Sequence, residues 1–283
     1  MPIFGAAASL FPLAAFADQP KPWGYRFQEP AGDMMRQIAW FEVYTLWFVI
    51  PITLFVLGLL LYVSWRFSEK RNPVPSKTSH NSLIEVIWTI GPVLILIAIA
   101  IPSFQLLTAQ FNPPTPPKFT VKATGYQWYW GYEYQTEKPL TLESRLLADA
   151  DRAAAGKEDI AAYPRQLVVD NEMVVPLGET IRLITTGNDV IHAFAMPALG
   201  IKLDAVPGRL NETWFKADKE GLFYGQCSEI CGKDHAFMPL AIRVVPQAKF
   251  DAWFAAAQTD LPGAYKSLMA DIAAAKTVDV AKN

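Results

Sequence analysis

Charged residues are scarce in this chain, and so are cysteine and histidine. Only 18% of its 283 residues are charged, the formal net charge is -2, and there are two cysteines and three histidines. Soluble domains carry roughly 25% charged residues. Because 52% of the residues are hydrophobic, intrinsic disorder is excluded, and the near-zero net charge argues against nucleic acid as a partner. Two cysteines cannot build a disulfide framework, and no repeat of fixed period is visible.

The missing charge is explained by two long apolar runs near the amino terminus. Residues 43–65 and 86–111 contain no charged side chain, and each run exceeds the roughly 20 residues that a helix needs to cross a bilayer. Buried helices of soluble proteins, the alternative interpretation, rarely continue this far without a charge. We therefore predict two transmembrane helices, at 41–66 and 85–111, with the lipid bilayer as a partner.

Charges around these runs predict the orientation. The loop at 67–84 and its borders hold four basic and two acidic residues, whereas the segment at 18–40 balances three of each. The positive-inside rule then places the loop in the cytoplasm and both termini outside, on the periplasmic side of a bacterial inner membrane. Residues 1–17 are apolar and end in Ala-Phe-Ala, which predicts a signal peptide, with a mis-assigned start codon as the alternative.

Beyond the second run, long apolar stretches give way to short alternating ones. A proline-rich spacer at 112–117 predicts a stiff, extended connection. Residues 118–246 hold short β-branched and aromatic runs separated by Gly, Pro, Asn or Asp, which predicts an all-β sandwich or barrel. Residues 143–163 indicate a helical or irregular insertion, and the alanine-rich tail at 247–283 is predicted to be helical.

Reactive side chains concentrate in one short loop. Cys227, Cys231, His235 and Met238 lie within twelve residues, between two predicted strands. A structural disulfide is the simplest interpretation, but it leaves the histidine and the methionine without a role. Zinc sites seldom use methionine, whereas sulfur ligands together with imidazole favour copper. A mononuclear blue-copper site needs one cysteine, so a second cysteine is the right number to bridge two metal ions.

A second imidazole has to come from elsewhere in the chain. His80 lies in the loop predicted to be cytoplasmic, on the opposite side of the membrane from the β domain. His192, in Asn-Asp-Val-Ile-His-Ala-Phe, follows a predicted strand. Alone it would be an ordinary loop histidine, but as the other outer imidazole it is the natural partner of the cysteine loop.

Four segments together resemble a known family. ATGYQWYWGYEY, NDVIHAF, LDAVPGRLNETWF and YGQCSEICGKDHAFMPL are similar to segments of cytochrome c oxidase subunit II, the CuA-containing subunit of haem-copper oxidases, of the bacterial type. The similarity covers about residues 35–255, including both predicted spans. It implies a two-helix transmembrane hairpin followed by an all-β cupredoxin-like barrel.

The resemblance also implies a dinuclear copper site in the outer domain. Cys227 and Cys231 would bridge the two copper ions. His192 and His235 would each bind one ion, and Met238 would complete the coordination of one of them. Such a site suits one-electron transfer and has no open position for a substrate.

Further ligands and partners follow from the same resemblance. The backbone carbonyl of Glu229 would bind the second copper, and its side chain would reach a magnesium ion shared with subunit I. The chain has no C-x-x-C-H motif and no intramembrane histidine, so the haems would belong to subunit I. There, electrons received from cytochrome c would reduce oxygen to water with proton pumping, in a complex with other oxidase subunits.

Four residues outside the ligand set have a role in the family and an ordinary alternative. Trp128, placed on the first outer strand, would be either a core ring or the electron-entry ring. Glu133 and Asp189 match docking positions for a basic cytochrome, but could equally be solvated carboxylates. Glu85, at the cytoplasmic start of the second span, would mark the helix end or form the entrance of a proton-uptake route.

Two other functions remain open at this stage. The chain could be the CuA subunit of a nitric-oxide or nitrous-oxide reductase, or a membrane-anchored copper chaperone. A chaperone predicts an exposed site that loses copper readily. The two spans and Glu85 favour a cytochrome c oxidase subunit over these alternatives. A quinol oxidase subunit is disfavoured because quinol oxidases lack the cysteine pair.

Overall fold

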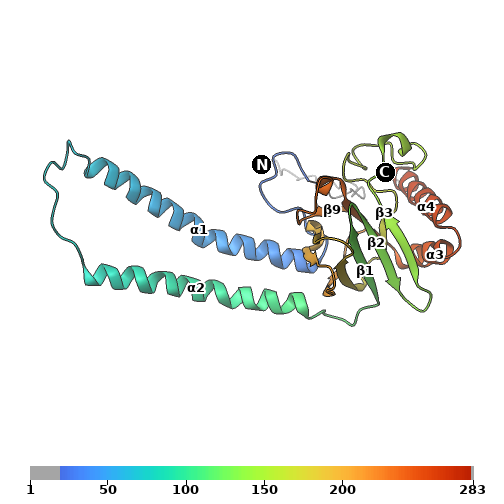
Figure 1. Ribbon diagram of the computed structural model, residues 1–283, viewed down its shortest axis with the longest axis horizontal. Coiled ribbons are helices and arrows are strands. Elements are labelled where there is room, and N and C mark those ends of the chain that lie inside the picture. Colours follow the sequence, from blue (N-terminus) through green and yellow to red (C-terminus); the bar gives the residue numbers. More distant parts are fainter. Residues whose placement is uncertain (1–19, 282–283) are drawn as a thin grey trace, which may run out of the picture. The chain divides into compact units, whose positions relative to one another are not determined.

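The computed structural model describes residues 20–281, so the predicted signal peptide at 1–17 lies outside the described residues. The chain divides into two compact units. Residues 36–112 form a helical unit, and the β unit combines the segment that ends at Met35 with the chain from Pro113 onward. In sequence, the helical unit is therefore an insertion into the β unit (Figure 1).

Two long apolar helices make up the helical unit. α1 (Asp33–Arg66) and α2 (Ser82–Phe111) are both long and apolar enough to cross a membrane, and their most apolar windows contain no buried residue. Unburied apolar side chains of this kind suit a lipid environment. The Tyr44 hydroxyl donates a hydrogen bond of 3.0 Å to the carbonyl oxygen of Ala98, which links the two helices.

The start of α2 is capped by its own sequence. The Asn81 side chain accepts hydrogen bonds from the N–H groups of Leu83 and Ile84, at 3.1 and 3.2 Å. In return, the Glu85 carboxylate accepts one from the N–H group of Asn81, at 3.1 Å. This reciprocal capping satisfies N–H groups that have no partner within the helix. Glu85 thus has a structural role at the helix start, and its role in proton uptake stays a prediction.

The β unit consists of two five-stranded sheets that share one core. The first sheet has the order β3-β2-β1-β5-β8, and its strands are β1 (Phe119–Tyr126), β2 (Tyr129–Gln135), β3 (Leu140–Ser144), β5 (Thr180–Gly187) and β8 (Asn211–Lys216). The second has the order β4-β10-β9-β6-β7, and its strands are β4 (Met173–Pro176), β6 (His192–Met196), β7 (Ile201–Ala205), β9 (Gly221–Cys227) and β10 (Pro239–Val245). This arrangement is the cupredoxin-like barrel expected from the sequence.

Side-chain alternation explains how the first sheet faces the core. In β2, Trp130, Tyr132 and Tyr134 are fully buried, whereas the residues between them are only half-buried. This period of two is the signature of a strand with one face on a core. β10 differs because all seven of its residues are buried. A second small core that includes Val169 and Leu222 covers the outer face of β9 and β10.

The segment before α1 belongs to the β unit. The N–H group of Ala31 donates to the carbonyl oxygen of Ala198, at 2.8 Å, and the N–H group of Asp218 donates to the carbonyl oxygen of Ala31, at 2.9 Å. Ala31, Met34 and Met35 are buried. The backbone N–H and carbonyl groups of Ala31 are therefore both bonded to residues of the β unit that follow α2 in the sequence.

The insertion at 143–163 is irregular, apart from the end of β3 and one short 3-10 helix, η1 (Asp149–Asp151). The tail forms two helices, α3 (Gln247–Ala257) and α4 (Leu261–Ala281), as predicted from its composition. Buried side chains of both tail helices join the main core: Phe250, Trp253, Ala257, Tyr265 and Leu268.

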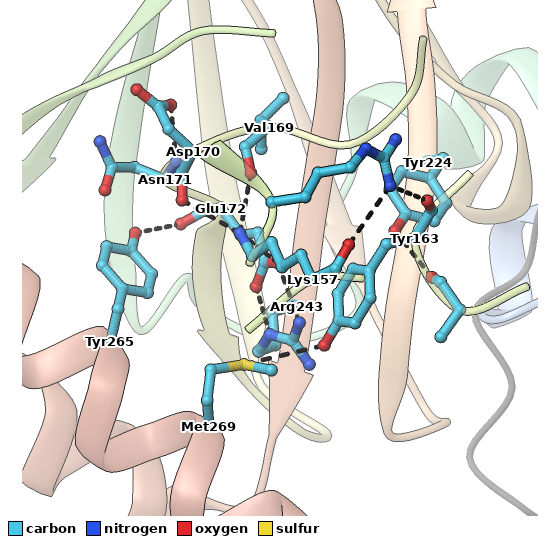
Figure 2. A network of polar contacts seen from close by, with 12 residues as sticks. Lys157, Tyr163, Val169, Asp170, Asn171, Glu172, Tyr224, Arg243, Tyr265 and Met269 are labelled. Carbon is cyan, nitrogen blue, oxygen red and sulfur yellow. Dashed lines mark hydrogen bonds and ion pairs between the residues drawn. The ribbon is translucent and has the colours of Figure 1, made fainter. Parts of the chain in front are cut away.

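A buried network of charges fastens the insertion to the barrel and the tail (Figure 2). The Glu172 carboxylate, only 1% exposed, pairs with Arg243 of β10 and with the Lys157 ammonium group at 3.1 Å. Lys157 also donates to the carbonyl oxygens of Val169 and Asp170, at 2.7 and 3.0 Å. All three ammonium hydrogens therefore have acceptors, which is what a buried lysine requires.

Tyrosines extend this network to the tail helices. The Tyr265 hydroxyl of α4 donates to the backbone carbonyl of Glu172, at 2.5 Å. The Tyr163 hydroxyl lies 4.0 Å from the sulfur of Met269, also on α4 (Figure 2). The insertion, β10 and α4 are consequently held together around one buried residue, Glu172, through its carboxylate and its backbone carbonyl.

Candidate metal centre

Segments that are far apart in the sequence meet at one end of the barrel. Cys227 is the last residue of β9, and His192 is the first residue of the neighbouring strand β6. The loop from Cys227 contains the short helix η3 (His235–Phe237) and leads through Met238 into β10. The fold thus brings one histidine to a cysteine loop that begins 35 residues later.

The side chains predicted as metal ligands converge within contact distance. The two thiol sulfurs, of Cys227 and Cys231, lie 3.8 Å apart. Cys227 Sγ is 3.9 Å from His192 Nδ1. Cys231 Sγ is 3.6 Å from His235 Nδ1 and 3.5 Å from the Met238 sulfur. Both cysteines are free, so the disulfide interpretation does not describe this structure, in which the sulfurs are far beyond the roughly 2.05 Å of a disulfide bond.

The chemistry of this donor set fits copper. The ligand atoms of His192, Cys227 and Cys231 all lie within 4.8 Å of one another, and all three residues are buried. Two thiols, two imidazoles and a thioether form a soft donor set, which selects copper over the hard cations that prefer oxygen. The two thiols lie at the centre of the cluster, between the imidazoles of His192 and His235.

The two thiols differ in acidity. Burial opposes ionisation of Cys227, but hydrogen bonding from His192 and backbone contacts at Glu229 and Ala193 outweigh it and lower the pKa to about 7. For Cys231, burial and the neighbouring Cys227 thiolate both disfavour the charged form and raise the pKa to about 12.

His192 is held from several directions and is fully buried. Its Nε2 atom lies 2.8 Å from an oxygen of Asp189, so Nδ1 faces Cys227. Trp130 packs edge-on against the imidazole, with 6.0 Å between ring centroids. Gly125 of β1 lies directly against the ring, because a Cβ atom there would be 2.7 Å from an imidazole carbon. The imidazole therefore has one available position.

Trp128 lies in the two-residue turn between β1 and β2, so its predicted place on a strand is wrong. The turn reaches the cysteine loop, because the Gln127 amide and the Trp128 indole N–H both donate to the carbonyl oxygen of Cys231, at 2.9 and 3.2 Å. Gly232 permits this approach: a Cβ atom there would be 2.8 Å from the indole ring, and its φ of 129° is unfavourable for other residues. The half-buried indole is thus in direct contact with the loop.

The remaining predicted site residues lie in different surroundings. The backbone carbonyl oxygen of Glu229 is 3.3 Å from Cys227 Sγ, and the residue is exposed. Glu133, in β2, pairs with Lys122 across the sheet at 3.5 Å. Glu85 belongs to the helical unit. The sequence interpretation missed Gln127, although it lies next to the aromatic residue that was singled out.

A glycine substitution tests how tightly the His192 ring is held. In Gly125→Ala, the added methyl group would overlap the imidazole, because it would lie 2.7 Å from an imidazole carbon. We expect the variant to fold but to lose copper to a chelator about 10- to 100-fold faster, the usual cost of disturbing a ligand's supporting contacts. Gly91→Ala is the control, because Gly91 lies in the helix α2, where alanine is favourable, and a Cβ atom there meets nothing within 4 Å. Equal copper release in the two variants would contradict the tight packing.

Comparisons with known proteins agree along the chain. The family models described as "Cytochrome C oxidase subunit II, transmembrane domain" and "Cytochrome C oxidase subunit II, periplasmic domain" match residues 20–106 and 119–245. A protein of Rickettsia bellii named "Probable cytochrome c oxidase subunit 2" is 46% identical over 246 residues, covering 87% of this chain and 88% of that protein. "Cytochrome c oxidase subunit 2" of Cereibacter sphaeroides is 43% identical over 270 residues, covering 88% of each.

A solved structure is also similar to the β unit. The periplasmic domain of subunit II of cytochrome oxidase of Bradyrhizobium japonicum is 54% identical, with a TM-score of 0.45. The match covers 51% of this chain and 96% of that domain. With both family models and relatives matched over most of their length, the chain is a membrane protein that belongs to the cytochrome c oxidase subunit II family.

Proposed function

We propose that this chain accepts single electrons from cytochrome c at a dinuclear copper centre and passes them to a haem of subunit I in a cytochrome c oxidase. One observation carries the proposal: two thiols, two imidazoles and a thioether converge at one end of the barrel, in contact with the turn that holds Trp128. The oxygen chemistry would take place in subunit I, and this chain would be an electron relay.

The residues that would hold the metal are the six predicted from the sequence: His192, Cys227, Glu229 through its carbonyl, Cys231, His235 and Met238. When bound there, the copper ions would supply one-electron transfer. The protein holds the ligands in place beforehand, since His192, Cys227, Cys231 and Met238 are each at most 5% exposed. This burial excludes water and leaves no position for a substrate.

Trp128 is the proposed point of electron entry. Its indole N–H is bonded to the carbonyl oxygen of Cys231, and its ring touches Gly232, so it is linked to the loop that carries the ligands. It is half-buried rather than sealed in the core, so that a docked redox protein could approach it. Glu133 and Asp189 remain proposed docking residues for the basic face of cytochrome c.

Other parts of the proposal concern the assembled oxidase. The exposed Glu229 side chain is free to bind a magnesium ion shared with subunit I, as proposed from the family resemblance. Glu85 would form the entrance for protons, and the β unit would lie on the periplasmic side of the plasma membrane. Subunit I and the other oxidase subunits would be the permanent partners.

The burial of the site argues against a copper chaperone. A chaperone must present its metal to another protein, which requires exposed ligands that exchange readily. Here the bridging thiols are 5% and 4% exposed, and His192 is completely buried. Such a site suits permanent occupancy.

Metal content is the direct test. The full-length chain, loaded in detergent, should bind two copper ions and show the multi-line electron paramagnetic resonance spectrum of an electron shared between two coppers. The reason is that two bridging sulfurs 3.8 Å apart would serve both ions equally. A content of one copper per chain, or a disulfide between Cys227 and Cys231 in the loaded protein, would be incompatible with the proposal.

A further inference from the structure

The carboxylate of Asp189 is engaged by three groups of the protein. One oxygen, Oδ2, accepts a hydrogen bond of 2.7 Å from the N–H group of Gln127. The other, Oδ1, accepts one of 2.7 Å from the N–H group of Val190 and lies 2.8 Å from His192 Nε2. Its side chain is 28% exposed, so most of it faces the protein. The protein therefore holds this carboxylate in one orientation.

Each of these contacts connects a different part of the site. Gln127 begins the turn that also holds Trp128, and its side chain donates to the carbonyl oxygen of Cys231. The same turn is thus bonded to the cysteine loop through its side chains and to the histidine ligand through Asp189.

The hydrogen bond between Asp189 and His192 also determines which imidazole nitrogen faces the cysteine sulfurs. An imidazole that donates its Nε2 hydrogen to a carboxylate keeps the lone pair on Nδ1 free for a metal ion. Nδ1 is the atom that points to Cys227, at 3.9 Å. Gly125 and Trp130 also pack against the ring and limit its movement.

We propose that Asp189 is a positioning residue, whose carboxylate orients the ligand His192 and ties it to the turn that carries the electron-entry ring. The inference rests on the proposed copper site and adds a structural role to the proposed docking role of this residue. Glu133 provides the contrast, because its recorded partners are the side chains of Lys122 and Gln135 on the same sheet, not a ligand.

Two substitutions separate hydrogen bonding from charge. Asp189→Asn removes the charge and the bond from Gln127, whose N–H group would face the NH2 group, but its amide oxygen can still accept from His192 and Val190. Asp189→Ala removes the charge and all three hydrogen bonds. If Asp189 positions the ligand, copper should leave the Ala variant about 10- to 100-fold faster than the wild type when a chelator is added, whereas the Asn variant should stay within about threefold. The full-length, copper-loaded chain in detergent is the sample.

A second readout observes the ligand itself. Pulsed electron paramagnetic resonance resolves the coupling of the shared electron to each histidine nitrogen. We expect one of the two couplings to change in Asp189→Ala, and both to be preserved in Glu133→Ala, which removes a carboxylate of β2 that has no contact with a ligand. If Asp189→Ala does not fold, Asp189→Ser takes its place, because a hydroxyl retains the local bond to Val190 but is too short to reach His192.

The possible outcomes are distinct. Equal copper release from the wild type, Asn and Ala proteins, with unchanged nitrogen couplings, would overturn the positioning role. If, in addition, Asn and Ala raised the apparent KM for cytochrome c equally, Asp189 would be a docking charge. A wild-type chain that does not bind two copper ions would instead refute the proposed function, before any variant is compared.

Discussion

Replacing Trp128 by glutamine is expected to slow the reduction of the copper centre by bound cytochrome c by orders of magnitude, with no loss of copper. The glutamine amide can still donate to the carbonyl oxygen of Cys231, as the indole N–H does at 3.2 Å. What disappears is the ring that touches Gly232. Tunnelling weakens steeply when a bridging ring is removed, whereas the ligands, none of which is Trp128, keep their positions.

Stopped-flow reduction of the copper-loaded chain by cytochrome c measures this rate directly. Tyr129→Leu is the matched control, because Tyr129 lies at the other end of the same turn and stacks on Tyr126 at 4.6 Å. The control removes an aromatic ring from the turn but leaves Trp128 in place. If Trp128→Gln is reduced by cytochrome c at the wild-type rate, the Trp128 ring has only a structural role. If the variant loses copper, the ring supports the cysteine loop.

Replacing Glu172 by glutamine is expected to lower the free energy of unfolding of the β unit by about 3–5 kcal/mol, the usual cost of removing one partner from a buried ion pair. Here one carboxylate neutralises two buried cations, Arg243 and Lys157. Without it, two positive charges would remain in a region where each is at most 6% exposed. Urea unfolding of the full-length chain in detergent, followed by near-ultraviolet circular dichroism, measures the loss.

Glu143→Gln is the control for this effect. Glu143 pairs with Arg145 at 2.7 Å, but both side chains are about half exposed, so water replaces the lost interaction and the change should stay below about 1 kcal/mol. A loss of similar size in the two variants would mean that the Glu172 network contributes no more than a surface pair.

The pH dependence of the free energy of unfolding tests the same network independently. Burial opposes the charge of Glu172, but the attraction of Arg243 and Lys157 outweighs it and lowers the pKa to about 2, from an ordinary value of 4.5. Because the folded-state pKa is the lower one, this stabilisation is complete above pH 4.5 and is lost as the pH falls towards 2. The Gln variant should lack this part of the acid dependence.

The sequence predicted the parts of the molecule that depend on local patterns. Uncharged runs longer than a bilayer is thick identified the two helices, and alternating aromatic residues such as Trp130, Tyr132 and Tyr134 identified a strand with one buried face. The spacing of Cys227, Cys231, His235 and Met238 identified the loop, because these ligands are close neighbours in the chain. His192 was reached only by elimination among three histidines.

Contacts between distant segments could not be predicted in this way. Trp128 was assigned to a strand because the aromatic run has no glycine or proline at the turn itself. The pairing of Glu172 with Arg243 joins residues 71 positions apart, and either side chain would ordinarily be expected at the surface. The bond between Asp189 and Gln127 likewise exists only because the turn between β1 and β2 meets the start of β6.

The hydrogen bonds of Ala31 to Ala198 and Asp218 have a consequence for membrane topology. A segment that precedes α1 is paired with backbone that follows α2, and the two can meet only in one aqueous compartment. The chain must therefore cross the bilayer an even number of times between them, which two spanning helices satisfy and one would not. This parity follows from two backbone bonds and is independent of any count of basic residues. During synthesis, both hydrogen bonds can form only after Asp218 has been added to the chain. Asp218 follows Ala31 by 187 residues, the difference between 218 and 31.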